Sequence, residues 1–158
     1  MEYAVSINPR GTYLHVQVRG DNDADTIHRY FDEVLAACAA QDIRHVLVEE
    51  FLEGPALSVT DVFQIVSSMA EEIRSVLRLI AFVDGRPGRS PLNVRFGETV
   101  AVNRGLAVRT FELVTEAEAW LAGEIVRREA GRRASAAAPG STGRRGSGTA
   151  PASVPARA

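Results

Sequence analysis

Apolar and polar residues alternate with a period of two in two segments near the N-terminus, residues 3–7 and 12–18. This period is typical of a strand that is buried on one side. Between the segments lies Asn8-Pro9-Arg10-Gly11, which favours a tight turn. Two strands joined so closely predict an antiparallel hairpin at the edge of a sheet.

The rest of the chain alternates between helical spacing and short apolar runs. Apolar residues recur every three or four positions in four segments, which predicts helices over about 27–40, 59–74, 91–103 and 115–125. Short apolar runs predict buried strands over 45–51, 76–83 and 106–111. The order ββαβαβαβα therefore predicts an α/β fold, with a mostly parallel sheet of about five strands, an antiparallel N-terminal edge hairpin and four helices.

Capping residues mark the ends of these helices. Ser58 with Asp61 has the pattern of a capping box, and Thr115-Glu-Ala-Glu118 repeats it. Ser90-Pro91 is typical of a helix start, and Gly105 of a helix stop. The inner faces are expected to carry Val62, Phe63, Val66, Met69 and Ile73 in the second helix, Val94, Val100 and Val102 in the third, and Ala119, Trp120, Leu121 and Ile125 in the last.

Composition divides the chain into two parts. From about residue 130 it consists mainly of Ala, Gly, Ser, Pro and Arg, which bury too little to offset the entropy of ordering. We therefore expect a folded domain over residues 1–129 and a disordered tail over residues 130–158. The domain carries 13 arginines against 20 acidic residues, whereas the tail has five arginines and no acid. The acidic domain disfavours binding to duplex nucleic acid.

The cysteine count, the N-terminal residues and the apolar runs bear on the cellular location of the protein. Cys38 is the single cysteine, which excludes an internal disulfide. The N-terminal residues lack the pattern of a signal peptide, and no window approaches the roughly 18 apolar residues of a membrane span. We expect a cytoplasmic protein without a membrane span.

The functional surface is expected at the carboxyl ends of the parallel strands, where ligands bind in sheets of this kind. Those ends lead into residues 19–25, 49–58 and 84–90. Glu49 and Glu50 end the central strand, and neighbouring strand residues point to opposite faces. At most one of these two carboxylates can therefore face a given site.

The residue types in these loops favour binding over catalysis. Glu49 or Glu50 with Asp84 or Asp21 would give half of an acid–base system. No nucleophile or metal-ligand set accompanies them, and the three histidines match no zinc spacing. We predict no enzymatic activity, no metal and no cofactor.

Arg86, Arg89 and Ser90 form a candidate anion site. A Gly-Pro loop with two arginines beside a helix start could hold a phosphate or a lipid headgroup. The alternative is that the glycines of this loop only serve its turn.

Four motifs carry a family resemblance: Phe96-Gly-Glu98, Ala101-Val-Asn-Arg-Gly105, Val108-Arg-Thr-Phe111 and Glu118-Ala-Trp-Leu121. Together with the element order, they resemble the STAS domain of bacterial anti-sigma factor antagonists. More specifically, they resemble a small STAS-like subfamily that is also compared with the CRAL-TRIO lipid-transfer domain. The resemblance covers about residues 1–125 and implies a regulatory or ligand-binding module.

The resemblance also implies a phosphorylation site. In antagonist-type members, a kinase modifies a Ser or Thr at the start of the helix that follows the central strand. The usual motif is Asp, then Ser or Thr, then a small residue and Gly. Here Glu49-Glu50 is followed by residues 51–57 before Ser58, so Ser58 and Thr60 are the positions left for that role. The alternative is that Ser58 is only a helix cap.

Two functions from different classes follow. The first is a non-enzymatic interaction module that docks onto a regulatory protein or kinase through the loop and helix after the central strand. Its contacts would be Glu50, Phe51, Leu52, Leu57, Ser58 and Thr60. The second is a binder of a small anionic or lipid-like ligand at the strand-end loops.

Overall fold

A computed structural model describes residues 3–86 and 91–137 of the chain. The elements in these ranges are β1 (Ala4–Pro9), β2 (Leu14–Asp21), α1 (Ala24–Gln41), β3 (His45–Glu53), α2 (Val59–Val76), β4 (Leu79–Asp84), α3 (Pro91–Asn103), β5 (Val108–Phe111) and α4 (Val114–Ala137).

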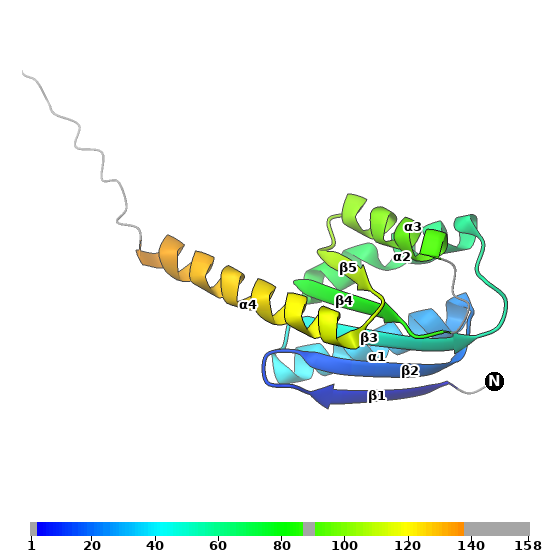
Figure 1. Ribbon diagram of the computed structural model, residues 1–158, viewed down its shortest axis with the longest axis horizontal. Coiled ribbons are helices and arrows are strands. Elements are labelled where there is room, and N and C mark those ends of the chain that lie inside the picture. The colour runs from blue at the N-terminus through cyan, green and yellow to red at the C-terminus, as the bar shows by residue number, and fades with distance from the viewer. Residues whose placement is uncertain (1–2, 87–90, 138–158) are drawn as a thin grey trace, which may run out of the picture.

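The strands form one sheet in the order β1-β2-β3-β4-β5 (Figure 1). β1 pairs with β2 in antiparallel orientation, and the other neighbouring strands are parallel. Each parallel connection passes through one helix, as a crossover unit requires. The predicted α/β fold is confirmed, with an N-terminal edge hairpin, five strands and four helices in the described residues.

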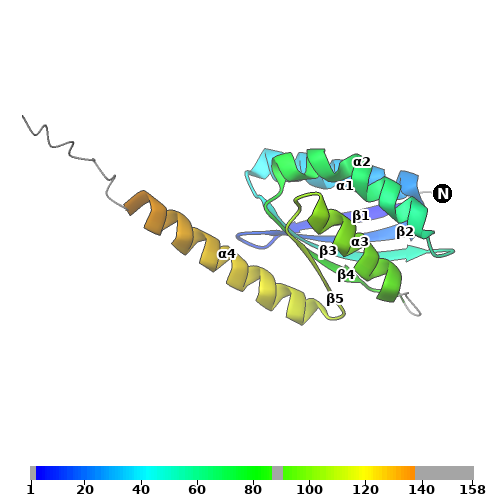
Figure 2. The same cartoon turned by 90° about the horizontal axis from the view of Figure 1, so that it is seen from above.

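Helices cover both faces of the sheet. α1, α2 and α3 lie on one face and α4 lies across the other (Figures 1 and 2). Alternation along β3 divides its apolar residues between them: Val46 and Val48 belong to the core under α1 and α2, and Leu47 to the core under α4. The domain therefore has two cores, one on each side of the sheet.

Local capping sets the helix starts and stops. Ser58 is the N-cap of α2: its side chain accepts a hydrogen bond from the Asp61 N–H at 3.1 Å, and its own N–H donates to the Asp61 carboxylate at 3.2 Å. The predicted capping box is confirmed. Gly105 follows α3 with a φ of +84°, which confirms the predicted stop because glycine adopts this conformation at little cost.

Three predicted inward-facing side chains are exposed instead. One is Ala119 in α4, where Ala117 takes the buried position, and the other two lie in α2 and α3. Phe63 in α2 is 45% exposed and Val102 in α3 is 51% exposed. Ile65 and Ala101 take the buried positions. Both helices carry apolar residues on adjoining sides, so the sequence is compatible with more than one helix rotation, and packing on the sheet selects one.

Some boundaries also differ from the prediction. β4 begins at Leu79, because α2 continues to Val76. Thr115 lies within α4 rather than at its N-cap. α4 continues to Ala137, so residues 130–137 are helical beyond the expected boundary at residue 129, and the rest of the predicted tail lies outside the described residues.

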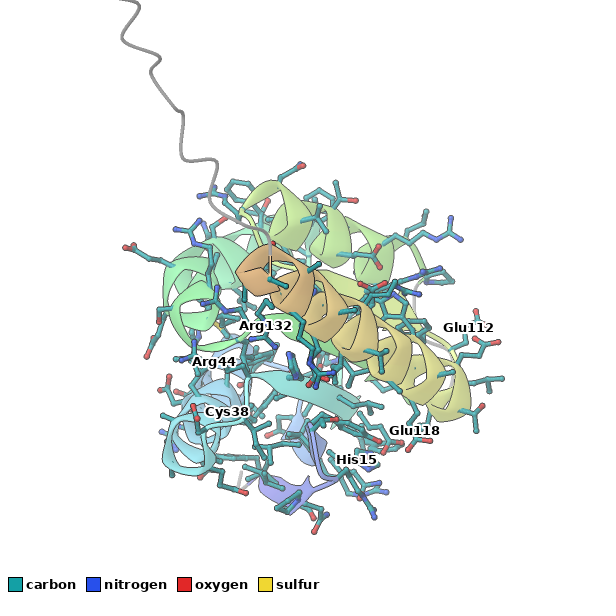
Figure 3. All side chains as sticks on the ribbon, turned by 90° about the vertical axis from the view of Figure 1, so that its left-hand side faces the viewer. His15, Cys38, Arg44, Glu112, Glu118 and Arg132 are labelled. Carbon is teal, nitrogen blue, oxygen red and sulfur yellow. The ribbon has the colours of Figure 1, made fainter. Side chains whose placement is uncertain are left out.

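The C-terminal half of α4 projects away from the sheet (Figures 1 and 2). Apart from the half-buried Glu129, its side chains are exposed, Arg132 among them (Figure 3). None of the helices in the described ranges is long and apolar enough to span a bilayer.

Candidate functional site

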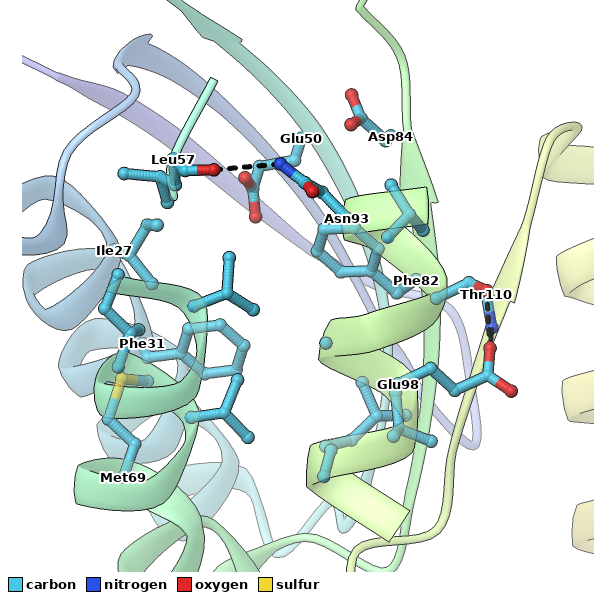
Figure 4. A pocket seen from close by; sticks show the side chains of 18 of the residues that line it. Ile27, Phe31, Glu50, Leu57, Met69, Phe82, Asp84, Asn93, Glu98 and Thr110 are labelled. Atoms are coloured by element: carbon cyan, nitrogen blue, oxygen red, sulfur yellow. Dashed lines mark hydrogen bonds between the residues drawn. The ribbon is translucent and has the colours of Figure 1, made fainter. Parts of the chain in front are cut away.

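A cavity of about 180 Å³ lies between the sheet and the helices α1, α2 and α3 (Figure 4). Most of its wall is apolar and comes from the helices and from β4 and β5. The apolar lining consists of Ile27, Phe31, Leu57, Val62, Ile65, Val66, Met69, Ile73, Ile80, Phe82, Val94, Gly97, Ala101, Leu106 and Val108.

Small residues on α3 help to explain the cavity. Gly97 and Ala101 lie one turn apart on the wall that α3 contributes. A Cβ at position 97 would lie 3.4 Å from the Val62 side chain, an ordinary van der Waals distance, so α3 and α2 are close neighbours here. Short side chains at both positions leave the space in front of them open.

Polar side chains gather at the end of the cavity near the carboxyl ends of β3 and β4. Glu50 and Asp84 are register partners on these neighbouring strands, and both are buried. The Tyr30 hydroxyl from α1 donates to Glu50 at 2.5 Å. Arg86 donates to both carboxylate oxygens of Asp84, from Nε at 3.0 Å and from a terminal nitrogen at 2.8 Å. This geometry places two carboxylates side by side, with a phenol bonded to Glu50 and a guanidinium bonded to Asp84.

The environment changes the acid strength of two of these groups. Burial raises the pKa of Glu50 to about 7, and the negative charge of Asp84 adds to this, while the Tyr30 hydrogen bond and Arg86 oppose it. Burial also raises the pKa of the Tyr30 hydroxyl well above its ordinary value, with Glu50 contributing in the same direction. Tyr30 therefore stays a hydrogen-bond donor, and Glu50 changes charge near neutral pH.

A third carboxylate lines the cavity from α3. Glu98 accepts hydrogen bonds from the Thr110 N–H at 2.9 Å and from its hydroxyl at 2.5 Å (Figure 4). These bonds hold α3 against β5. Asn93 makes a similar link at the other end of α3, where its side-chain N–H donates to the Leu57 carbonyl at 2.8 Å.

The structure separates the six residues proposed for partner contact. Leu52 is fully buried and Glu50 is 9% exposed, so neither lies on the outer surface. Phe51 is half-buried, with the Arg19 guanidinium 4.5 Å above its ring. Leu57 is also half-buried and lines the cavity, whereas Ser58 and Thr60 are exposed at the start of α2.

Of the three candidate anion-binding residues, Arg86 alone is described. It lines the cavity, and its guanidinium is engaged by Asp84. Arg89 and Ser90 lie outside the described residues.

Glu49 faces the opposite side of the sheet from Glu50, as strand alternation predicts. It pairs with the ring of His15 and accepts a hydrogen bond from Gln17 at 3.0 Å. The two adjacent carboxylates of β3 therefore serve different faces, and only Glu50 reaches the cavity. Cys38 is buried in the core, and burial raises the pKa of its thiol to about 11.

Tyr30, Asn93, Glu98 and Thr110 were not predicted as site residues. Tyr30 belongs to the apolar stripe of α1, where its hydroxyl is the one available signal. Glu98 and Thr110 belong to two of the motifs that carry the family resemblance. Glu98 and Thr110 come together at the cavity only through the packing of α3 on the sheet.

Comparisons with known proteins address the fold. No protein-family model matches the sequence, and neither does any curated protein. Among solved structures, the chain is similar to the crystal structure, at 2.25 Å resolution, of an uncharacterized DUF3478-family protein with a SpoIIAA-like fold from Shewanella loihica PV-4. The TM-score is 0.50 at 17% sequence identity, and the match covers 75% of this chain and 93% of that chain.

The fold is SpoIIAA-like. This finding confirms the predicted resemblance to STAS domains at the level of the fold. The SpoIIAA-like scaffold accounts for the element order, whereas the cavity and its carboxylates belong to the residues of this chain.

Proposed function

We propose that this chain is a non-enzymatic binding module that takes a small, largely apolar molecule into the cavity between α1, α2, α3 and the sheet. The cavity itself carries the proposal. It is open to the surface on one side and holds about 180 Å³, and its apolar walls with a few converging polar groups are typical of a ligand pocket. An engineered apolar cavity of about 150 Å³ binds benzene, so a molecule the size of a small aromatic compound suits this one.

Binding is favoured over catalysis because of the residue types that line the cavity. Among the described residues, its polar lining contains Asn, Tyr, Glu, Asp, Arg and Thr, but no Ser, Cys or His. Carboxylates held by a phenol and a guanidinium can recognise a polar group on a ligand. The raised pKa of Glu50 in a cleft is a further mark of a functional site.

Filling the cavity should abolish binding. We expect the double substitution Val66→Phe and Ala101→Leu, which adds bulk from α2 and α3, to weaken the binding of indole at least about tenfold, because the added side chains occupy the space that the ligand needs. Indole is a neutral probe of suitable size, and titration followed by amide NMR shifts would measure its affinity and its location.

The matched control is Val102→Phe, which adds the same kind of bulk on the exposed side of α3. It should bind indole as the unmodified chain does. If indole shifts amides far from the cavity, or if the filled variant still binds it, the cavity is not the binding site.

A second candidate is docking of a regulatory protein or kinase through the loop after β3 and the start of α2. Val59 and Phe63 favour it, because these large apolar side chains are 53% and 45% exposed, one turn apart and beside Ser58 and Thr60. The SpoIIAA-like fold supports a regulatory module of this kind. Leu57 directly precedes Ser58 and lines the cavity, so ligand binding and docking would share the loop.

This docking surface should be sensitive to charge. With a photo-crosslinking residue in place of Thr60, we expect one host protein to be captured and its yield to fall at least about tenfold with Phe63→Asp, since a buried charge at an interface is strongly unfavourable. Mass spectrometry would identify the captured peptides and any phosphate on Ser58 or Thr60. Val102→Asp is the control, and an equal loss with it would contradict the docking proposal.

A further inference from the structure

We propose that the cavity selects an apolar molecule with an amine head, and that the Glu50 carboxylate receives the ammonium group. This inference rests on the proposed function, because it names the class of ligand that the same cavity would take. It departs from the anionic ligand expected from Arg86.

The charges of the polar lining favour a cation over an anion. In the described residues, the cavity is lined by three carboxylates and one guanidinium. The guanidinium of Arg86 is bound by Asp84 through two hydrogen bonds, and its backbone N–H donates to the same carboxylate at 3.1 Å. Among the described residues, an anionic head would therefore meet the carboxylates of Glu50 and Glu98 and a cation that is already paired. A positive head would reduce this imbalance.

The hydrogen-bonding groups favour the same polarity. Tyr30 donates its hydroxyl proton to Glu50, which leaves the other acceptor sites of that carboxylate for a ligand. The Glu50 side chain and Asn93 lie together at this end of the cavity (Figure 4). Asn93 donates to Leu57, and its amide oxygen remains as an acceptor. An ammonium group supplies three donors, so it matches a polar end that is rich in acceptors.

The protonation state of Glu50 should make amine binding depend on pH. The pKa of Glu50 lies near 7 because burial and the charge of Asp84 raise it against the opposing effects of Tyr30 and Arg86. The side chains that α2 contributes to the cavity are apolar, and α3 adds Asn93 and the bonded Glu98. A bound ammonium favours ionised Glu50, so amine binding below about pH 7 should release a proton and weaken as the pH falls.

The experiment compares three ligands that differ mainly in the head group: 2-phenylethylamine, 2-phenylethanol and phenylacetate. Calorimetry with the full chain at about pH 8, where the amine is protonated, should show the amine binding at least about tenfold more tightly than phenylacetate. Glu50→Gln should remove this preference and keep the affinity for 2-phenylethanol. Glu49→Gln is the matched control, because it removes the neighbouring carboxylate on the opposite face, and it should keep the preference.

Three other outcomes would contradict the amine preference, the role of Glu50 or the binding function itself. Phenylacetate binding as tightly as the amine would overturn the amine inference and leave the proposed binding function in place. An amine preference that survives Glu50→Gln would overturn the role of Glu50. If none of the three ligands binds and indole does not bind either, the proposed function fails and the inference fails with it.

Discussion

Glu50→Gln should stabilise the protein at about pH 8 and leave its stability near pH 4 almost unchanged. The carboxyl is buried, and its pKa is raised from 4.5 in an unfolded chain to about 7. Below about pH 4.5 the group is protonated in both states. As the pH rises towards 7, the unfolded chain loses this proton first, so the wild-type free energy of unfolding falls. Each pKa unit is worth about 1.4 kcal/mol, so the full penalty is about 3–4 kcal/mol.

Denaturant unfolding of both proteins across this pH range measures the effect. The difference in free energy of unfolding should grow between about pH 4.5 and 7 and then stay constant. Glutamine keeps an acceptor for the Tyr30 hydroxyl, which limits other losses. Glu53→Gln, at an exposed position of the same strand, is the control and should show little change. A difference that does not depend on pH would contradict the prediction.

The unfavourable ionisation of Glu50 is consistent with a binding role. A carboxylate that destabilises the empty protein at neutral pH gains a partner when a cationic ligand enters, so part of the burial cost is offset on binding. Functional sites often retain such locally unfavourable groups, and substitutions that relieve them raise stability at the expense of function. The same Glu50→Gln variant should therefore be more stable and less selective.

The parts of the fold that follow from local pattern could be predicted from the sequence. The N-terminal hairpin, the capping box at Ser58 and the stop at Gly105 each depend on residues close together in the chain. The hairpin turn lies at residues 10–13 rather than at the predicted Asn8–Gly11, because Asn8 and Pro9 still pair with β2. The opposite orientation of Glu49 and Glu50 follows from the period of a strand. These local rules are sufficient for the element order, and the topology then follows from short right-handed crossovers.

The cavity could not be predicted, because it depends on how distant elements pack. The pairing of Glu50 with Asp84 requires the register of β3 against β4. The space in front of Gly97 and Ala101 requires the rotation of α3, and the valines on either side of that helix are compatible with another rotation. Phe63 was misplaced for the same reason in α2. A cavity is also a space that side chains leave unfilled, so no residue type in the sequence indicates it.

Leu121→Ala should destabilise the domain by about 2–5 kcal/mol, the usual cost of removing a fully buried leucine. Leu121 has no exposed surface and belongs to the core that α4 forms with β3 and β4. Ala117 and Ile125, the other buried residues of α4, lie one turn away on either side, so this short stripe holds the helix on the sheet.

Denaturant unfolding measures the loss of stability in Leu121→Ala. Val126→Ala, at a position that is 64% exposed on the same helix, should cost little. Because this core lies across the sheet from the cavity, the folded Leu121→Ala protein should still bind indole. A loss as small as that of Val126→Ala would show that α4 does not stabilise this face.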